Sequence, residues 1–265
     1  MKRKLCLTGP ILSAIRSILW LVAMMQVLTA TPVFAYRPFA TEDAGVAGKG
    51  VLQTEISYDF LKWKNGDSDQ TLLIVTPIYG PTENLELSVE TPFIVHKSDG
   101  RRTEGIGDIN LVGKYVLFWD NYETKDALLT LKGVVKLNSG SFERGLGRGD
   151  TEFSLSPVMS KIITDKLTAH AQLGYTFVTG RQDHNLRDYI YYGLALDYAV
   201  IKQLHLVTEL TGNQNPDRTL DYQNLWLCGF TYEVNKHLSL DATYKKGIGR
   251  DSPAWGFGVG AAIEF

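Results

Sequence analysis

Cysteine, long apolar runs and helical periodicity are all scarce in this sequence of 265 residues. The two cysteines, Cys6 and Cys228, give no disulfide framework. The five histidines are scattered singly and without metal-ligand spacing, so we expect no metal and no cofactor. From residue 51 onward no stretch has the apolar period of an amphipathic helix. These shortages exclude a disulfide-stapled scaffold and a helical domain.

Residues 1–35 have the three parts of a secretory signal peptide. Their basic residues are Lys2, Arg3, Lys4 and Arg16. An apolar run follows at 18–28, and a small-residue exit ends at Ala35. A membrane-anchor helix is the alternative, but the run is short for a hydrocarbon core of about 30 Å. We expect cleavage after Ala35, so that the mature chain begins at Tyr36.

Loss of this leader changes the charge balance. The full chain has a net charge of −2, whereas residues 36–265 hold 23 basic and 29 acidic residues, a net charge of −6. The acidic balance argues against nucleic acid as a partner. Cys6 leaves with the leader, so Cys228 has no partner for a disulfide within the mature chain.

Apolar and polar residues alternate with the period of a β-strand in about twelve segments. Each segment is about ten residues long or slightly longer, the length of a tilted strand that crosses a membrane. Pro157 lies inside one of them, where its missing N–H predicts a bulge, unless the span assigned to this segment is out of register. The predicted spans are 51–62, 70–80, 84–95, 107–119, 127–137, 150–162, 167–179, 188–200, 203–213, 221–234, 237–247 and 254–265.

The connections between these segments alternate in length. Polar, glycine-rich connections such as 97–105, 138–149 and 180–187 are separated by tight ones such as 80–83 and 235–236. Long loops on one rim and short turns on the other are typical of an outer-membrane barrel. We therefore predict an all-β fold, a transmembrane antiparallel outer-membrane β-barrel of about 12 strands over residues 51–265. A secreted β-sandwich, which also alternates, is the alternative.

Charged residues fall on the polar parity of the predicted strands. Facing lipid, each would cost about 2–4 kcal/mol near the midplane, whereas a wet lumen tolerates them. Acids on the first and third segments and lysines on the fifth predict either a transverse field across an open bore or the neutral packing of a closed lumen. The predicted lumen-lining residues are Glu55, Asp59, Glu86, Glu90, Lys114, Lys132, Lys136, Glu152, His170, Glu209, Asp241 and Lys245.

The last strand is apolar at every second residue and ends on an aromatic side chain. It resembles the C-terminal signal of outer-membrane barrels that the barrel-assembly machinery reads. That resemblance implies the assembly machinery as a partner. The residues that would carry the signal are Phe257, Val259, Ile263 and Phe265.

Two motifs carry a family resemblance. Residues 36–45 read Tyr-Arg-Pro-Phe-Ala-Thr-Glu-Asp-Ala-Gly, and residues 105–115 read Gly-Ile-Gly-Asp-Ile-Asn-Leu-Val-Gly-Lys-Tyr. Both resemble motifs of the outer-membrane transporter family associated with the meta-cleavage pathway of phenol degradation, although Glu42 stands where Asp is usual. The resemblance covers essentially the whole mature chain. It implies a barrel that passes small aromatic or other hydrophobic compounds.

Residues 36–50 precede the first predicted strand and allow two interpretations. They form either a flexible periplasmic lead-in or a short plug that enters the lumen. In a plug, Arg37, Glu42 and Asp43 would pair with inward-facing charges.

One pattern resembles an enzyme site. His96 and Ser98, with Asn110 downstream, loosely match the His-x-Ser and Asn of outer-membrane phospholipases, in which Ser is the nucleophile and His the base. Strand parity turns His96 and Ser98 inward or into a loop, whereas a phospholipase needs its nucleophile toward lipid. We therefore predict no enzyme, and keep a phospholipase-like surface enzyme as an alternative.

The sequence thus predicts an exported protein of the Gram-negative outer membrane that passes small molecules by diffusion through a charged lumen. Its expected partners are outer-membrane lipid, the assembly machinery and small hydrophobic or aromatic solutes. A structural or adhesive barrel with a closed lumen is the alternative function.

Overall fold

The computed structural model describes residues 39–120, 126–179 and 185–265, so the predicted signal peptide lies outside the described residues. The strands are β1 (Leu52–Lys62), β2 (Ser68–Thr82), β3 (Leu85–Glu90), β4 (Pro92–Ser98), β5 (Arg101–Ile106), β6 (Asn110–Trp119), β7 (Ala127–Lys136), β8 (Glu152–Thr164), β9 (Leu167–Val178), β10 (Tyr189–Ile201), β11 (Leu204–Asn213), β12 (Gln223–Asn235), β13 (Leu238–Ile248) and β14 (Trp255–Glu264).

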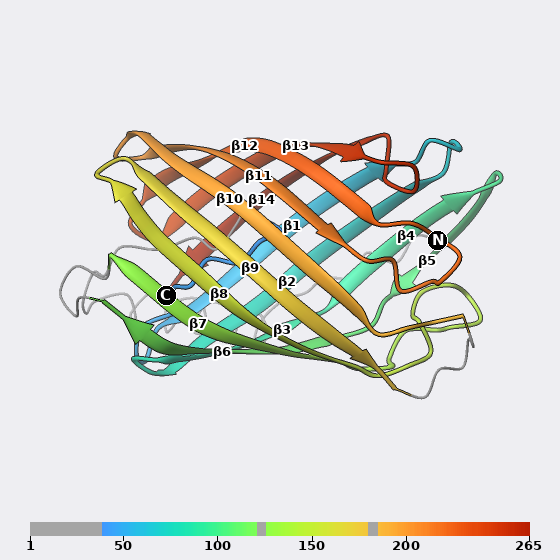
Figure 1. Ribbon diagram of the computed structural model, residues 1–265, viewed down its shortest axis with the longest axis horizontal. Helices are drawn as coiled ribbons and strands as arrows, with labels where there is room; N and C mark the ends of the chain where they lie inside the picture. The colour runs from blue at the N-terminus through green and yellow to red at the C-terminus, as the bar shows by residue number, and fades with distance from the viewer. Residues whose placement is uncertain (1–38, 121–125, 180–184) are drawn as a thin grey trace, which may run out of the picture.

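The strands close into one antiparallel barrel (Figure 1). β1 pairs with β2 on one side and with β14 on the other, from Gln53↔Glu264 to Lys62↔Trp255. β3 and β4 both pair with β2, while β3 pairs with β6 and β4 with β5. β3 and β4 are therefore consecutive parts of one long strand, and β5 and β6 are consecutive parts of the next, each with a local break. The wall has twelve strands, as predicted, and the pairing of β1 with both β2 and β14 closes it, as a membrane barrel requires.

The connection predicted as a polar loop at 97–105 is instead the tip of a hairpin. β4 and β5 pair from Phe93↔Ile106 to Ser98↔Arg101. Asp99 and Gly100 both have positive φ angles, 49° and 75°. Two positive φ angles are typical of a tight hairpin turn whose twist matches its strands, and Asp-Gly is a favoured sequence for it. The prediction was wrong because polar composition also suits a strand pair that extends beyond the membrane.

Pro157 interrupts pairing without shifting the register. β8 and β9 pair at Leu155↔Tyr175 and again at Val158↔Gln172, which belong to the same register. Pro157 still lies opposite Leu131 of β7. The bulge that the sequence predicted is therefore absent at this point of the described chain, and only local pairing toward β9 is lost.

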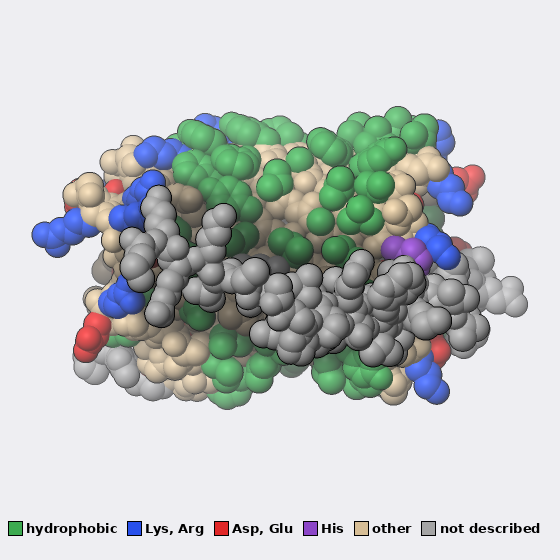
Figure 2. All heavy atoms as spheres, turned by 180° about the vertical axis from the view of Figure 1, so that it is seen from behind, with side chains coloured by type: hydrophobic (Ala, Val, Ile, Leu, Met, Phe, Trp, Pro, Cys, Tyr) green, Lys and Arg blue, Asp and Glu red, His purple; other side chains and the backbone are tan. Residues whose placement is uncertain are grey.

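The barrel turns apolar side chains outward. On β9, Leu173 is 59% exposed and Phe177 is exposed, whereas the alternate residues Gln172 and Thr176 are buried. Hydrophobic side chains form a band around the middle of the face in Figure 2, and charged side chains gather at its two ends. This arrangement matches a hydrocarbon layer flanked by polar head groups. Among the described residues, no helix has the length and apolarity to cross a membrane.

The predicted assembly-signal residues lie on the outward parity of β14 and at its end. Phe257, Val259 and Phe265 are exposed, and Ile263 is half-buried. Phe257 also contacts the rings of Tyr58 and Phe60 on β1, across the seam that closes the barrel. Their recognition by the assembly machinery stays a prediction.

A cation on the outer band should destabilise the barrel. We expect Leu194→Arg, at a side chain 62% exposed on β10, to lower the free energy of unfolding in lipid by about 2–4 kcal/mol. Leu220→Arg, also exposed but in the connection after β11, is the matched control and should change it little. Equilibrium unfolding in lipid vesicles measures both, and equal effects would contradict the proposed membrane band.

Candidate functional site

Residues 39–50, here called the lumen segment, lie inside the barrel and are bound to its inner face. In Figure 1 the segment is the blue trace that leads into β1. Five of its backbone N–H groups donate hydrogen bonds to wall side chains. The bonds run from Ala40 to Glu209 Oε2 (2.9 Å), Thr41 to Glu209 Oε1, Glu42 to Gln172 Oε1 (3.0 Å), Ala44 to Ser160 Oγ (2.8 Å) and Ala47 to Glu86 Oε2 (2.7 Å).

These bonds explain how a stretch without regular structure stays inside. A buried backbone N–H requires an acceptor, and the segment has no strand or helix of its own to supply one. The wall supplies acceptors from β3, β8, β9 and β11 instead. The hydroxyl of Thr130 of β7 donates a hydrogen bond to the carbonyl of Ala44, a fully buried residue of the segment. The contacts span much of the wall from β3 round to β11.

Two glycines let the segment approach the wall. A Cβ on Gly193 of β10 would lie 1.8 Å from Thr41 Oγ1 and 2.9 Å from its Cβ. A Cβ on Gly80 of β2 would lie 2.2 Å from the carbonyl oxygen of Gly48. Any side chain at either position would therefore push the segment inward.

Glu42 is the electrostatic centre of these contacts. Its carboxylate lies 3.4 Å from Lys114 Nζ and accepts a hydrogen bond from Lys132 Nζ. Burial alone would raise the pKa of Glu42, but the two ammonium groups outweigh burial and hold the pKa at about 2. Glu42 is therefore an anion at neutral pH.

The register of the wall explains why an anion is needed there. Glu86 of β3 lies opposite Lys114 of β6, and Lys114 lies opposite Lys132 of β7. Two like charges directly opposite each other destabilise a sheet. Glu42 offsets this repulsion because its carboxylate contacts both lysines.

The pKa of Asp43 is shifted in the opposite direction from that of its neighbour Glu42. Burial raises the pKa of Asp43 to about 7, although Lys114 opposes the shift; Glu42 and Glu86 add to it. One carboxylate oxygen accepts the N–H of Gly45 at 2.6 Å. The two adjacent acids thus titrate in separate ranges, because Lys132 acts together with Lys114 to lower the pKa of Glu42, whereas burial outweighs Lys114 at Asp43.

The other predicted lumen residues lie on the same inner face, none of them exposed. Lys245 pairs with Asp59, Lys136 pairs with Glu152 (2.6 Å), Glu90 accepts from Asn110 (2.7 Å), and Glu55 accepts from Gln53 (3.5 Å). His170 bonds to Ser160 Oγ (2.8 Å), and its ring lies 5.4 Å from that of Phe39. Asp241 is buried on β13. Arg37 lies outside the described residues.

Sequence reasoning missed a second cluster, which surrounds Asp108. Its carboxylate accepts the N–H groups of Gly140 (2.9 Å) and Arg148 (3.1 Å), so it holds the connection between β7 and β8. Arg148 also bonds to Glu152 at 2.8 Å. A Cβ on Gly147 would lie 2.4 Å from Asp108 Oδ1. The Gly-x-Gly-Asp motif carries the family resemblance, but the motif alone does not show that Asp108 holds this loop.

The uncharged acceptors Gln172 and Ser160 were also missed. Their inward parity was visible in the sequence, and it is the only signal that could have indicated them. Parity does not distinguish a wall residue that meets water from one that binds the lumen segment.

The structure does not bring His96, Ser98 and Asn110 together as a catalytic group. His96 Nδ1 bonds to Asp69, and Ser98 Oγ donates to Asp67 at 2.9 Å. Asn110 donates to Glu90. These separate partners leave the phospholipase-like alternative without the hydrogen bonds that it requires. Among the described residues no group of His, Cys, Asp or Glu could hold a metal.

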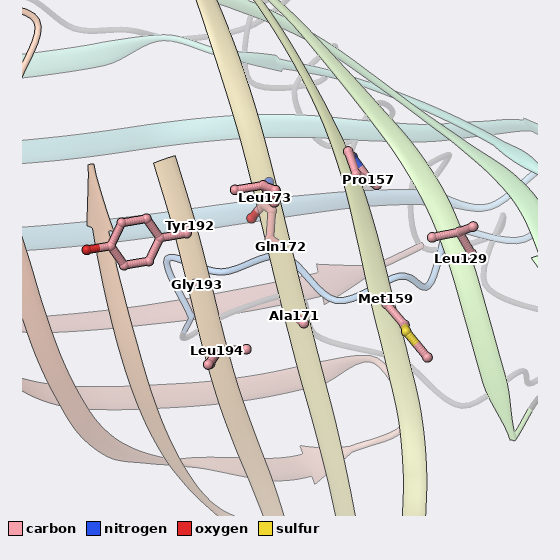
Figure 3. Close-up of a pocket in the computed structure, with 9 residues that line it drawn as sticks. All are labelled: Leu129, Pro157, Met159, Ala171, Gln172, Leu173, Tyr192, Gly193 and Leu194. Atoms are coloured by element: carbon pink, nitrogen blue, oxygen red, sulfur yellow. The ribbon is translucent and has the colours of Figure 1, made fainter. Parts of the chain in front are cut away.

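An apolar hollow of about 410 Å³ lies in the barrel wall over β7, β8, β9 and β10, with Pro157 among its lining residues (Figure 3). Met159, Leu173 and Leu194, which line it, are exposed on the outer face. The hollow therefore belongs to the lipid-facing surface. Gln172 and Gly193, which contact or approach the lumen segment, also line it.

Closed pairing, an apolar outer band and a charged interior define a porin-like outer-membrane β-barrel. The KdgM porin is similar in structure, with a TM-score of 0.56, 12% identity, and coverage of 80% of this chain and 99% of that one. The NanC porin has a TM-score of 0.54, 11% identity, and coverage of 80% and 98%. At such identities these likenesses show the fold alone. A search of curated proteins gave no sequence match.

The family model described as "Putative MetA-pathway of phenol degradation" matches residues 35–265. The chain belongs to this family, which confirms the resemblance carried by the two sequence motifs.

A side chain at Gly193 should dislodge the lumen segment. We expect Gly193→Val to raise the rate at which a maleimide labels Ala44→Cys by about tenfold. This corresponds to a loss of about 1.4 kcal/mol in the free energy that holds the lumen segment against the wall. Gly133→Val is the matched control, since no atom lies within 4 Å of a Cβ at that glycine of β7. Cys228 is replaced by serine in all samples, because it is a free thiol. Equal rates in both variants would contradict close packing at Gly193.

Proposed function

We propose that this barrel is an outer-membrane channel for small solutes and that the lumen segment is a plug that controls its bore. One observation carries the proposal: Glu42 lies between Lys114 and Lys132 inside the barrel, while backbone groups on both sides of it are bound to the wall. A segment held in this way narrows any path through the lumen.

The contacts suit a plug that can move. A hydrogen bond to a neutral acceptor such as Gln172 or Ser160 contributes a net stabilisation of about 0.5–1.5 kcal/mol, and one to a carboxylate such as Glu209 or Glu86 contributes about 1.5–3 kcal/mol, because water replaces each bond when it breaks. The apolar anchoring includes Ala47 packed against Ile78, with Val51 beside them, and the ring contact of Phe39 with His170. The segment is also joined to β1 at its C-terminal end, so it can leave the bore without leaving the barrel.

The class of solute is proposed from the family. Its description concerns phenol degradation, which supports small aromatic compounds as cargo. The two similar structures are porins by name, which supports passive passage. We accordingly propose diffusion of small, chiefly aromatic, solutes across the outer membrane rather than chemistry on them. Export by the signal peptide and insertion by the assembly machinery belong to the same proposal.

A structural barrel with a closed lumen is the second candidate. It is favoured by the pairing of lumen charges, since Lys245 bonds to Asp59 and Lys136 to Glu152. Conductance separates the two candidates, because a closed structural barrel passes no ions whether or not the lumen segment is present.

Removal of the plug should open the bore. We expect the refolded mature protein without residues 36–50 to show discrete single-channel steps in a planar bilayer, larger or longer-lived than those of the intact chain. Glu42→Lys in the intact chain should also make the single-channel steps larger or longer-lived, because a third cation beside Lys114 and Lys132 would repel the segment from the wall.

Glu83→Lys is the control for this series. Glu83 is an exposed residue in the turn between β2 and β3, so the same charge change there should leave the steps unaltered. The absence of single-channel steps in both the truncated protein and Glu42→Lys would contradict the channel proposal and favour the structural barrel.

The plug should also respond to pH. Asp43 faces Lys114, Glu86 and its neighbour Glu42, and its pKa in the docked segment is about 7, against an ordinary 3.8. Between pH 3.8 and about 7, Asp43 is protonated when the lumen segment is bound to the wall and ionised when the segment is released. Binding of the segment to the wall therefore weakens as pH rises from about 4 to 7. Glu42 acts oppositely, because its lowered pKa makes docking weaken as pH falls from 4.5 to 2.

We accordingly expect the open fraction of single channels to be lowest near pH 4 and to rise toward pH 7. Asp43→Asn should abolish the rise between pH 4.5 and 7, whereas Asp165→Asn in an exposed turn should not. A rise that persists unchanged in Asp43→Asn would show that another group controls it.

A further inference from the structure

Lys114 and Lys132 form an enclosed pair of cations in the middle of the inner wall. Their side chains are 2% and 13% exposed, and they project from adjacent positions of β6 and β7. Both ammonium groups meet one carboxylate, that of Glu42. Because Glu42 belongs to the lumen segment and not to the wall, the lysine pair is a site whose occupant can leave.

The acids of the wall near this pair have hydrogen-bond donors of their own. Glu86 accepts the N–H of Ala47, and Glu90 accepts the side-chain amide of Asn110. Even with these acids close by, the lysine pair keeps Glu42 ionised, as its lowered pKa shows. The site therefore favours a carboxylate strongly enough to overcome burial and neighbouring negative charge.

We infer that Lys114 and Lys132 are a carboxylate-binding site in the lumen, that Glu42 occupies it as an internal ligand, and that the solutes this channel selects are small organic acids. The inference rests on the proposed channel function, since it names the class of solute. An entering carboxylate competes with Glu42 for the two ammonium groups, so cargo of this class promotes withdrawal of the plug.

The surroundings of the site suit a small acid. Gln172 Oε1 accepts the N–H of Glu42. The same side chain is therefore a hydrogen-bond acceptor for a donor group of an organic acid whose carboxylate lies between the two lysines. The ring of Tyr191 lies over Gly174, where a Cβ would meet its Cζ at 2.0 Å. Tyr191 also lies within electrostatic reach of Lys132. A planar organic acid thus meets cations, an amide acceptor and an aromatic surface together.

The test exploits the space that Glu42→Ala creates. This substitution removes a CH₂–COO⁻ group, the equivalent of acetate, and keeps the backbone bonds of the segment. Isothermal titration of the detergent-solubilised mature protein with acetate should show Glu42→Ala binding about tenfold more tightly than the wild type, because the tethered competitor is gone. Acetamide, which matches acetate in size but lacks its charge, should not bind.

Two further variants assign the binding to the lysine pair. Adding Lys132→Gln to Glu42→Ala should weaken acetate binding about tenfold or more, since a charged hydrogen bond is lost. Adding Lys166→Gln, in an exposed turn, should leave it unchanged. Heat-modified migration on gels shows that each variant is folded. Equal acetate affinities with and without Lys132, or equal binding of acetamide, would overturn the carboxylate site.

Conductance of the same samples separates this inference from the proposed function. Acetate binding without any conductance would reject the channel and leave the site standing as a feature of a closed lumen, which overturns the cargo assignment. Conductance without selective acetate binding would keep the channel and overturn the inference.

Discussion

The need to satisfy every backbone polar group determines the structure at two levels. In lipid no water can pair with an open strand edge, so the twelve strands close on themselves through β1 and β14. Inside the barrel the same need acts on the lumen segment, which has no ladder of its own. Acceptors from Glu209, Gln172, Ser160 and Glu86 take the place of a neighbouring strand. The wall and the segment thus depend on one physical requirement.

Charge adds selectivity to that framework. Lys114 and Lys132 lie directly opposite each other on the adjacent strands β6 and β7, and their like charges repel unless an anion lies between them. Glu42 is that anion, and it belongs to a tethered segment and not to a strand, so we propose exchange for this contact and not for wall pairs such as Lys245 and Asp59. The proposed plug, its response to pH and its preference for organic acids all follow from this one exchangeable contact.

Much of the fold could be predicted from period-2 alternation, because each side of the wall meets a different solvent. The same alternation predicted which charges face inward. It could not predict partners, since Glu42 reaches Lys132 over 90 positions in sequence. It also failed where composition is ambiguous: residues 97–105 are polar yet form a hairpin, and Pro157 breaks pairing without moving the register. The role of Asp108 required the fold of the connection that it holds.

The central claim is that the lumen segment lies against the inner wall, and a disulfide tests it most directly. Ala44→Cys and Ser160→Cys replace residues joined by a 2.8 Å hydrogen bond, in a Cys228→Ser background. The account predicts that oxidation of the folded, membrane-inserted protein cross-links this pair as completely as the wall pair Ser154→Cys and Thr176→Cys, whose hydroxyls lie 2.7 Å apart. Cross-linking of the wall pair alone would place the segment outside the lumen and contradict the account.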